Sequence, residues 1–340
     1  MDGSLNDRER MIMGIAAGHF GKDVIRVEAL KQSPHSSMRV WFSDGSVIAS
    51  QRHNYRRTHL EAMVLEQLSP ICDDVPTFLG LSDGFLFQSD IGHARLGDEI
   101  LEHDAADRIE LAAEACASIF RIQSAARQSG VVQLVPKIGT SQEWMENLVG
   151  SVDALQLFSG GIPDSFDFQA VADRLTVQKW DFVKWHCRPS YAVISDDGFL
   201  RWNGFDLSGS RHGAEDLAWL IGDEEWPIAP HDMLDIVKQT FDPHNGIGWD
   251  QYLDYLAVYT TLHCVQRFKL IIRGAQEHGW YCDQSMARKD SPGVDPNFAR
   301  QLCQVGAFFA DQSKLTRPLV RNFERTSFVT DAINQSDLRT

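Results

Sequence analysis

Residues 184–216 read KWHCRPSYAVISDDGFLRWNGFDLSGSRHGAED, and this stretch decides the fold class. A loop with a proline leads to two short apolar segments, residues 191–195 and 199–205, which we expect to be strands. The Asp-Asp-Gly sequence at residues 196–198 is typical of a hairpin turn, because Asp and Gly tolerate the positive φ that such turns need. An acid, Asp206, follows the second strand, and a polar loop then leads to the start of a helix.

The composition narrows the class of protein. The chain has 340 residues, enough for one large domain or two lobes. Hydrophobic residues make up 43% and charged residues 23%, which is ordinary for a globular protein. The net charge of −15 argues against nucleic acid or an anionic membrane surface as the main partner. It suits a cationic small-molecule ligand, and it equally suits plain solubility.

Targeting and redox signals favour a cytoplasmic protein. Residues 1–10 are polar and mixed in charge, unlike a signal peptide, and no run approaches the ~18 apolar residues of a membrane span. The six cysteines are scattered and form no C-x-x-C pair. We therefore expect reduced thiols and neither a disulfide framework nor a zinc site.

The first 90 residues predict an antiparallel sheet with one main helix. Thr58 reads as a helix N-cap and Glu61, three residues later, as its capping-box partner, so the helix should run to about Leu68. A shorter apolar helix is expected near the start of the chain, at residues 11–20. Strands are expected at residues 24–27, 38–42, 46–51, 75–81 and 85–88, with an Asp-Gly hairpin turn after the second.

The rest of the chain predicts mainly helices. After a connecting segment at residues 89–94, helices are expected at residues 105–128, 141–158, 166–185, 214–222, 231–240, 249–274 and 296–313. Residues 291–293 should form a loop, and the polar tail beyond Arg317 should fray. We therefore expect an α+β fold with two lobes, residues 1–90 and 91–340, the second carrying the hairpin at residues 184–207.

This order of elements resembles the aminoglycoside phosphotransferase and choline kinase-like family, the small-molecule branch of the bilobal protein-kinase-like fold. The resemblance covers roughly residues 24–280. It rests on Glu61 in its helix, Asp206 after its hairpin, and the Asp-Leu-Ala sequence that begins at Asp216. It implies ATP and Mg²⁺ as cofactors, Asp206 as a metal ligand, and Asp216 as the acid that holds the backbone of the catalytic loop.

Groups that phosphoryl transfer needs are missing from the first lobe. The family's third strand carries a lysine that pairs with the glutamate of the helix, and here Ser50 or Gln51 takes its place. Arg52 lies on the same strand face as Ser50 and is the cation that could reach the site. The loop expected over the phosphates, residues 30–37, contains no glycine and is a poor cradle for them.

The catalytic loop of the second lobe aligns in two ways. Matched on Pro189, the family's acceptor-orienting Asp becomes His186 and its Mg²⁺-binding Asn becomes Tyr191. Matched on His186, the same two positions hold Arg188 and Val193. Neither register supplies both groups. Tyrosine is a poor Mg²⁺ ligand, and histidine can accept a proton but offers no fixed negative charge.

Two functions remain open. In the first, the chain is a pseudokinase, a binding or regulatory module for a small molecule or a protein partner, in which binding of ATP and Mg²⁺ is doubtful. In the second it is an active phosphotransferase: Arg52 and His186 substitute for the missing groups, Asp206 holds a single Mg²⁺, and Glu61 and Ser50 belong to the nucleotide site. The missing residues favour the first. His186 as a packed core residue and Asp206 as a turn cap are the plainer interpretations of these two side chains.

Overall fold

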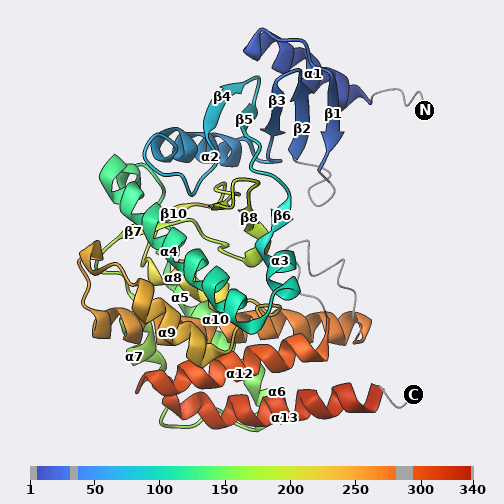
Figure 1. Ribbon diagram of the computed structural model, residues 1–340. Coiled ribbons are helices and arrows are strands. Elements are labelled where there is room, and N and C mark those ends of the chain that lie inside the picture. The colour runs from blue at the N-terminus through green and yellow to red at the C-terminus, as the bar shows by residue number, and fades with distance from the viewer. Residues whose placement is uncertain (1–5, 31–36, 281–293, 338–340) are drawn as a thin grey trace.

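The computed structural model describes residues 6–30, 37–280 and 294–337, with side chains described as far as residue 330. A small sheet stands above a larger, mainly helical part (Figure 1). The sheet is antiparallel, with strand order β1-β2-β3-β5-β4. Its strands are β1 (Arg26–Ala29), β2 (Ser37–Phe42), β3 (Gly45–Ser50), β4 (Phe78–Ser82) and β5 (Phe85–Ser89). The expected α+β, kinase-like architecture is confirmed.

Helix α1 (Asp7–Phe20) covers the outer face of the sheet (Figure 1). It begins earlier than the predicted helix at residues 11–20, because Asn6 and Glu9 form a capping box at its start. The two buried residues of α1 pack on apolar side chains from four strands, and the cluster comprises Ile12, Ala16, Val27, Met38, Val40, Phe42, Ala49, Phe85 and Phe87. The opposite face of the sheet is therefore turned toward the helical part.

Helix α2 (Tyr55–Leu68) lies against that opposite face, and it corrects one prediction. Its N-cap is Asn54, whose side chain accepts from the Arg56 N–H, so the predicted Thr58 cap is wrong. Thr58 is buried one turn inside the helix, where its hydroxyl accepts the Arg52 N–H at 2.8 Å. The buried apolar residues of α2 join the main core of the helical part.

The predicted hairpin is confirmed. Strand β8 (Ala192–Ile194) pairs antiparallel with β9 (Leu200–Trp202), and β8 also pairs with β6 (Ala94–Arg95). The connecting segment after β5 therefore forms a strand, and the short helix α3 (Leu96–Glu102) follows it. This pairing ties the chain between the two parts to the hairpin that follows the catalytic-loop-like segment.

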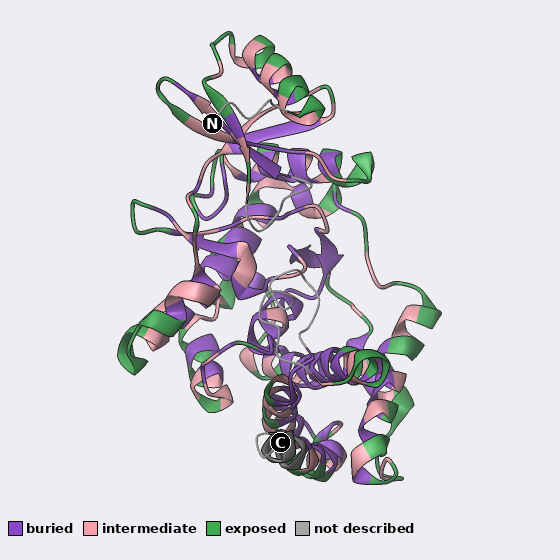
Figure 2. Cartoon of the chain, turned by 90° about the vertical axis from the view of Figure 1, so that its right-hand side faces the viewer, coloured by how far each residue is buried: buried purple, intermediate pink, exposed green. Residues whose placement is uncertain are grey.

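The helical part is built around α10, whose buried residues extend from Tyr252 to Ile272. Figure 2 shows that buried residues gather in the interior of this part. Its core is continuous from α2 to the last helix. The helices are α4 (Ala105–Ser129), α5 (Gln142–Val149), α6 (Gln156–Ser159), α7 (Phe168–Leu175), α8 (Ala214–Ile221), α9 (Pro230–Thr240), α10 (Trp249–His278), α12 (Pro296–Gln312) and α13 (Val320–Asp337).

Three expectations for this part are wrong. The helix expected at residues 141–158 is divided by a 3₁₀ segment, Gly150–Leu155. The helix expected at residues 166–185 ends at Leu175, because β7 (Asp181–Val183) pairs with β10 (Gly209–Arg211). The tail beyond Arg317 is helical, since buried apolar side chains such as Phe323 pack it against α12. The loop expected at 291–293 and most of the glycine-free loop, residues 31–36, lie outside the described residues.

Two further observations concern the cysteines and the apolar length of the helices. Five cysteines are buried and free: Cys72, Cys116, Cys187, Cys264 and Cys303. Cys282 lies outside the described residues. Within residues 6–30, 37–280 and 294–337, no helix is both long and apolar enough to cross a membrane.

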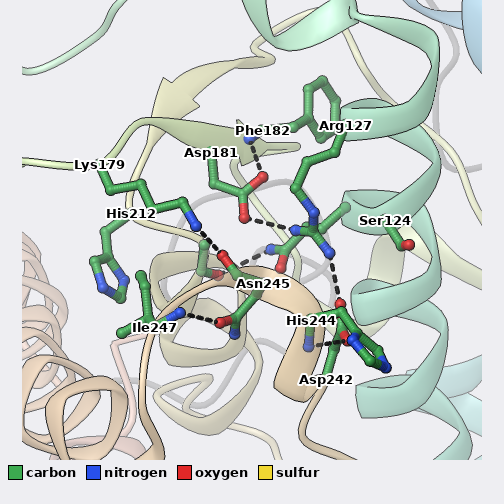
Figure 3. A network of polar contacts seen from close by, with 12 residues as sticks. Ser124, Arg127, Lys179, Asp181, Phe182, His212, Asp242, His244, Asn245 and Ile247 are labelled. Carbon is green, nitrogen blue, oxygen red and sulfur yellow. Dashed lines mark hydrogen bonds and ion pairs between the residues drawn. The ribbon is translucent and has the colours of Figure 1, made fainter.

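A polar network anchors β7, the strand that leads into residues 184–191 (Figure 3). Arg127 of α4 donates to Asp181 at 2.7 Å and to Asp242 at 2.6 Å. Lys179, just before the strand, donates to the backbone carbonyl of Asn245. One arginine of α4 thus fixes both the strand and the segment after α9, and removing it would leave the Asp181 carboxylate buried without its cation.

We expect Arg127→Met to lower the free energy of unfolding by about 3 kcal/mol, because breaking a buried ion pair leaves the partner charge uncompensated. Chemical denaturation measures the change. The control is Arg10→Met, which removes an ion pair with Asp7 on exposed α1 and should cost less than about 0.5 kcal/mol. Equal effects of the two substitutions would contradict this role for Arg127.

A second prediction concerns His212, which is buried and stacked on Tyr255 with ring centroids 3.7 Å apart. Burial lowers the pKa of His212 to about 3, and nearby Arg174 adds to the effect. The unfolded imidazole binds a proton below about pH 6.5 and the folded one does not. The stability that His212 contributes is therefore complete above that pH and is lost as the pH falls toward the folded pKa.

We expect this one residue to cost about 2 kcal/mol of folding free energy between roughly pH 6.5 and pH 5. His212→Asn keeps an acceptor for the Ala214 N–H and should flatten the pH dependence by that amount. His231→Asn, at an exposed histidine, should leave the slope unchanged. Denaturant titrations at several pH values compare the three proteins, and an unaltered slope in His212→Asn would refute the assignment.

Candidate functional site

The segment from Lys184 to Tyr191 follows β7 and faces the first lobe, with a strained backbone. Trp185 and His186 have φ of 61° and 54°, values that side-chain-bearing residues rarely adopt. The left-handed region costs roughly 1–2 kcal/mol for each such residue. Asp216, at the start of α8, accepts from the Lys184 N–H and the Trp185 N–H, both at 2.9 Å. These two bonds hold the loop, as the resemblance implies for Asp216.

Asp216 is itself buried within the core. Burial raises its pKa, and the two backbone donors and Lys184 act in the opposite direction. Gln123 of α4 also donates to the carboxylate, at 3.3 Å. A buried acid that accepts several N–H groups explains why the helix start is kept in a chain whose catalytic loop is changed.

His186 lies half-buried in this loop, next to the aromatic side chains of the core. Its ring meets Trp219 edge to face with centroids 4.6 Å apart, and Tyr191 lies 6.3 Å away. The alternative register, which puts Arg188 at the catalytic position, fits the structure poorly. Arg188 is buried and pairs with Asp223 at 2.6 Å and Glu224 at 3.0 Å. Those bonds turn its guanidinium into the core of the helical part.

Arg52, two residues beyond Ser50, makes the ion pair with Glu61 that the family's lysine would make. Its Nε donates to Glu61 Oε2 and its Nη2 to Glu61 Oε1, each at 3.0 Å. The same Nη2 lies 3.5 Å from Asp206 Oδ1. Arg52, Glu61 and Asp206 therefore meet in one cluster, which brings together three of the predicted site residues.

Glu61 belongs to this cluster and does not cap the start of α2. It is buried, and Oε1 also accepts the Phe205 N–H at 3.1 Å. It thus links the end of β3, helix α2 and the segment before Asp206. Burial by itself would lower the pKa of Arg52, but Glu61 and Asp206 outweigh it and raise that pKa, so the guanidinium is permanently charged.

Ser50, the other predicted site residue, lies on the sheet face that looks toward the helical part. In the β3–β5 pairing, Ile48 is opposite Gln88 and Ser50 is opposite Leu86, so these four side chains share one face. Ser50 and Gln88 are buried, and the Ser50 hydroxyl and the Gln88 Oε1 have no hydrogen-bond partner among the described residues. Buried polar groups are nearly always paired, so these two atoms are candidates for contact with a bound molecule.

Lys184 was missed by the sequence reading. Its ammonium is buried, 4.8 Å from the Tyr191 ring centroid, 5.4 Å from Phe205 and 5.8 Å from Trp202. It donates to the His186 carbonyl at 3.4 Å. Burial lowers its pKa. No local signal marks it, because its aromatic neighbours come from the hairpin and from the segment that follows it.

The connection between the lobes is also polar, which the sequence did not indicate. Arg39 of β2 pairs with Asp90 at 2.5 Å, and the Ser46 hydroxyl donates to the same carboxylate at 2.6 Å. Arg39 also donates to the Gly92 carbonyl at 3.4 Å. The arginine lies on the same sheet face as Ile48, its partner in the β2–β3 pairing. It fixes the connecting segment to the sheet beside Ser50 and Gln88.

The donor set does not suit the Mg²⁺ that the resemblance implies. Mg²⁺ binds carboxylate, amide and water oxygens in a near-octahedral shell. Asp206 offers one carboxylate, and the Arg52 guanidinium lies 3.5 Å from it. Tyr191 stands where an amide is needed, with its ring packed so closely on Gly204 that a Cβ there would lie 2.7 Å from it. No group of three or more His, Cys, Asp and Glu side chains in the described parts of the chain could hold a metal ion.

Comparison with known proteins identifies the fold. No family model matches the chain, and no curated protein matches its sequence. A macrolide 2′-phosphotransferase from Brachybacterium faecium aligns with a TM-score of 0.54 at 11% identity, over 83% of this chain and 96% of that one. A choline/ethanolamine kinase family protein from Mesorhizobium loti gives 0.52 at 12%, over 89% and 92%.

A spectinomycin phosphotransferase in complex with ADP and spectinomycin gives a TM-score of 0.51 at 10% identity, over 96% of this chain and 99% of that one. The structural neighbours are thus aminoglycoside phosphotransferases and choline kinases, and the chain has their protein-kinase-like fold. At these identities the likeness establishes the fold alone, and function has to be argued from the site.

The Asp216 anchor can be tested by Asp216→Asn. The amide keeps one acceptor and turns an N–H₂ toward the second backbone donor, so we expect a loss of about 2 kcal/mol of stability. Hydrogen exchange should also speed up at the Lys184 and Trp185 amides. Asp164→Asn, at an exposed acid outside the site, is the control and should change neither. Unchanged exchange at these two amides in Asp216→Asn would show that the loop is held by something else.

Proposed function

We propose that this protein is a pseudokinase: a nucleotide-binding module with the fold of small-molecule kinases that does not transfer a phosphoryl group. The observation that carries the proposal is the Arg52–Glu61–Asp206 cluster. It pairs the presumed metal-binding carboxylate with a fixed cation that belongs to the protein. Phosphoryl transfer in this fold relies on metal ions that bridge the phosphates and neutralise the developing charge.

Two substitutions in the catalytic loop support the same conclusion. In the register matched on Pro189, His186 replaces the acid that orients the acceptor hydroxyl. Tyr191 replaces the amide that would hold Mg²⁺. His186 is engaged with Trp219, so its ring is packed into the aromatic core beside the loop. A histidine in that position does not supply the fixed negative charge of a carboxylate.

A ligand role is supported by three polar side chains, Arg52, Ser50 and Gln88. Arg52 keeps its charge, and Ser50 and Gln88 keep polar atoms that lack protein partners. The spectinomycin phosphotransferase of the same fold was solved with ADP, which makes a nucleotide the first ligand to test. The acidic chain would suit a cationic small molecule or a basic protein partner beside it.

The competing proposal is an active phosphotransferase, and one observation favours it. The strained backbone at Trp185 and His186 is kept although both residues carry side chains. Strain of this kind concentrates at functional sites. Asp216 nevertheless accounts for the strain through its two backbone bonds, and this makes the loop conformation a requirement of the fold.

The test measures turnover and binding on the full chain. With labelled ATP, Mg²⁺ and a panel of aminoglycosides and choline, we expect no phosphorylated acceptor and no phosphate release above a mock preparation. ADP should still raise the melting temperature, since a ligand at ~100 times its Kd adds about 2.7 kcal/mol of stability. Turnover that disappears in Asp206→Asn would overturn the pseudokinase proposal. The exposed substitution Asp164→Asn controls for preparation differences.

A further inference from the structure

We propose that the site formed by Arg52, Ser50 and Gln88 binds a nucleotide without a divalent metal. Arg52 would supply the positive charge that the family's lysine and metal ion supply together. The inference rests on the proposed nucleotide-binding function and deepens it. It concerns the chemical form of the ligand, which would be the metal-free nucleoside di- or triphosphate anion. Three observations on the described residues carry it.

The first observation is the position of the guanidinium. The Nη2 atom of Arg52 is 2.9 Å from Glu61 Oε2 and 3.5 Å from Asp206 Oδ1. A dication on Asp206 would have to sit about 2.0–2.1 Å from its oxygen and would then face a fixed positive charge within a few ångströms. Arg52 is buried enough that solvent screens this repulsion poorly, since its side chain is 20% exposed.

The second observation is the donor capacity that Arg52 retains. A guanidinium has five N–H groups in a planar fork. The bonds to Glu61 and the approach to Asp206 use Nε and Nη2. No hydrogen bond to another described residue uses Nη1. Its two N–H groups are therefore available to phosphate oxygens, for which arginine geometry is well matched.

The third observation is independent of the charges. The buried Ser50 hydroxyl and Gln88 Oε1 share the sheet face that continues toward Arg52, and neither has a partner in the described parts of the chain. Two unpaired polar atoms in a buried strand pair are costly unless a ligand or water satisfies them. A nucleoside supplies donors and acceptors of the right kind, while its phosphates would lie toward the guanidinium. Arg52 and this pair together describe a site for a nucleoside phosphate.

The experiment is calorimetric titration of the full chain with ADP and with ATP, in EDTA and in millimolar Mg²⁺. We expect affinity in EDTA to equal or exceed affinity in Mg²⁺. Arg52→Gln should weaken binding by about tenfold or more in both buffers, because a charge-assisted contact is lost. Arg56→Gln is the matched control: this exposed arginine of α2 lies outside the cluster and should leave the affinity unchanged.

Because Arg52→Gln leaves Glu61 buried without its cation, a loss of binding has to be distinguished from a loss of the fold, and a second variant tests the metal directly. Arg52→Lys keeps the charge and the pairing with Glu61 but withdraws the fork from Asp206. Electron paramagnetic resonance of free Mn²⁺ should detect no Mn²⁺ bound by the native chain. It should detect binding by Arg52→Lys that disappears when Asp206→Asn is added. This measurement needs no nucleotide.

The outcomes separate this inference from the proposed function. Nucleotide binding that requires Mg²⁺, or Mn²⁺ binding to the native chain that depends on Asp206, overturns the metal-free site and leaves the absence of turnover untouched. Failure of ADP and ATP to bind in either buffer overturns this inference together with the nucleotide-binding part of the proposed function, and leaves the absence of turnover untouched. Mg²⁺-dependent turnover overturns both proposals.

Discussion

The guanidinium of Arg52 forms the ionic contacts that connect the two parts of the molecule. Through Glu61 it connects the end of β3 to helix α2, and through Asp206 it reaches the segment after the hairpin. Glu61 extends the connection by accepting the Phe205 N–H. A single, largely buried cluster thus spans the sheet, its helix and the second lobe. Removing the charge of Arg52 would leave Glu61 buried and uncompensated.

The same cluster explains how the fold can persist while its chemistry changes. In this architecture, the carboxylates of Asp216 and Glu61 have structural roles that do not depend on catalysis. Asp216 holds a strained loop by two backbone bonds, and Glu61 holds another backbone amide. These duties require an acid but no metal and no nucleotide. Retention of such acids is therefore evidence for the fold and says little about turnover.

Much of the architecture could be predicted, because it depends on local patterns. The hairpin around residues 196–198 and the helices α4, α8, α9 and α12 follow from turn residues and from the 3.6-residue period of apolar side chains. The failures have a common cause. The Thr58 cap matched the local pattern, but the chain outside it supplied a better cap, Asn54. The predicted helix before the loop lost its last residues to pairing with β10, a contact set by tertiary structure.

The site was less predictable, for a reason that Arg52 and Lys184 illustrate. The period of two put Arg52 on the correct face, but β3 ends at Ser50, so strand geometry alone could not place the guanidinium against Glu61. Lys184 is defined by aromatic rings at residues 191, 202 and 205, which only the folded hairpin and the segment after it bring together. Ser50 and Gln88 carry no signal until their missing partners are counted.

These residues also show why lost motifs should be judged by charge and geometry together. Compared residue by residue with the family pattern, the chain lacks a lysine, an aspartate and an asparagine. Each difference, taken alone, suggests loss of the catalytic site. In the structure, the pairing with Glu61 that a lysine would make is made by a residue two positions later, and its longer, forked side chain reaches Asp206 as well. In the metal-free site proposed above, this cation places a positive charge next to Asp206, where a divalent ion would otherwise lie. An amide at residue 191 would then have no metal to bind, and that position holds an aromatic ring over Lys184 instead. On this reasoning the residues at positions 52, 191 and 206 are coupled through the charge of Arg52, and they have to be judged as one site.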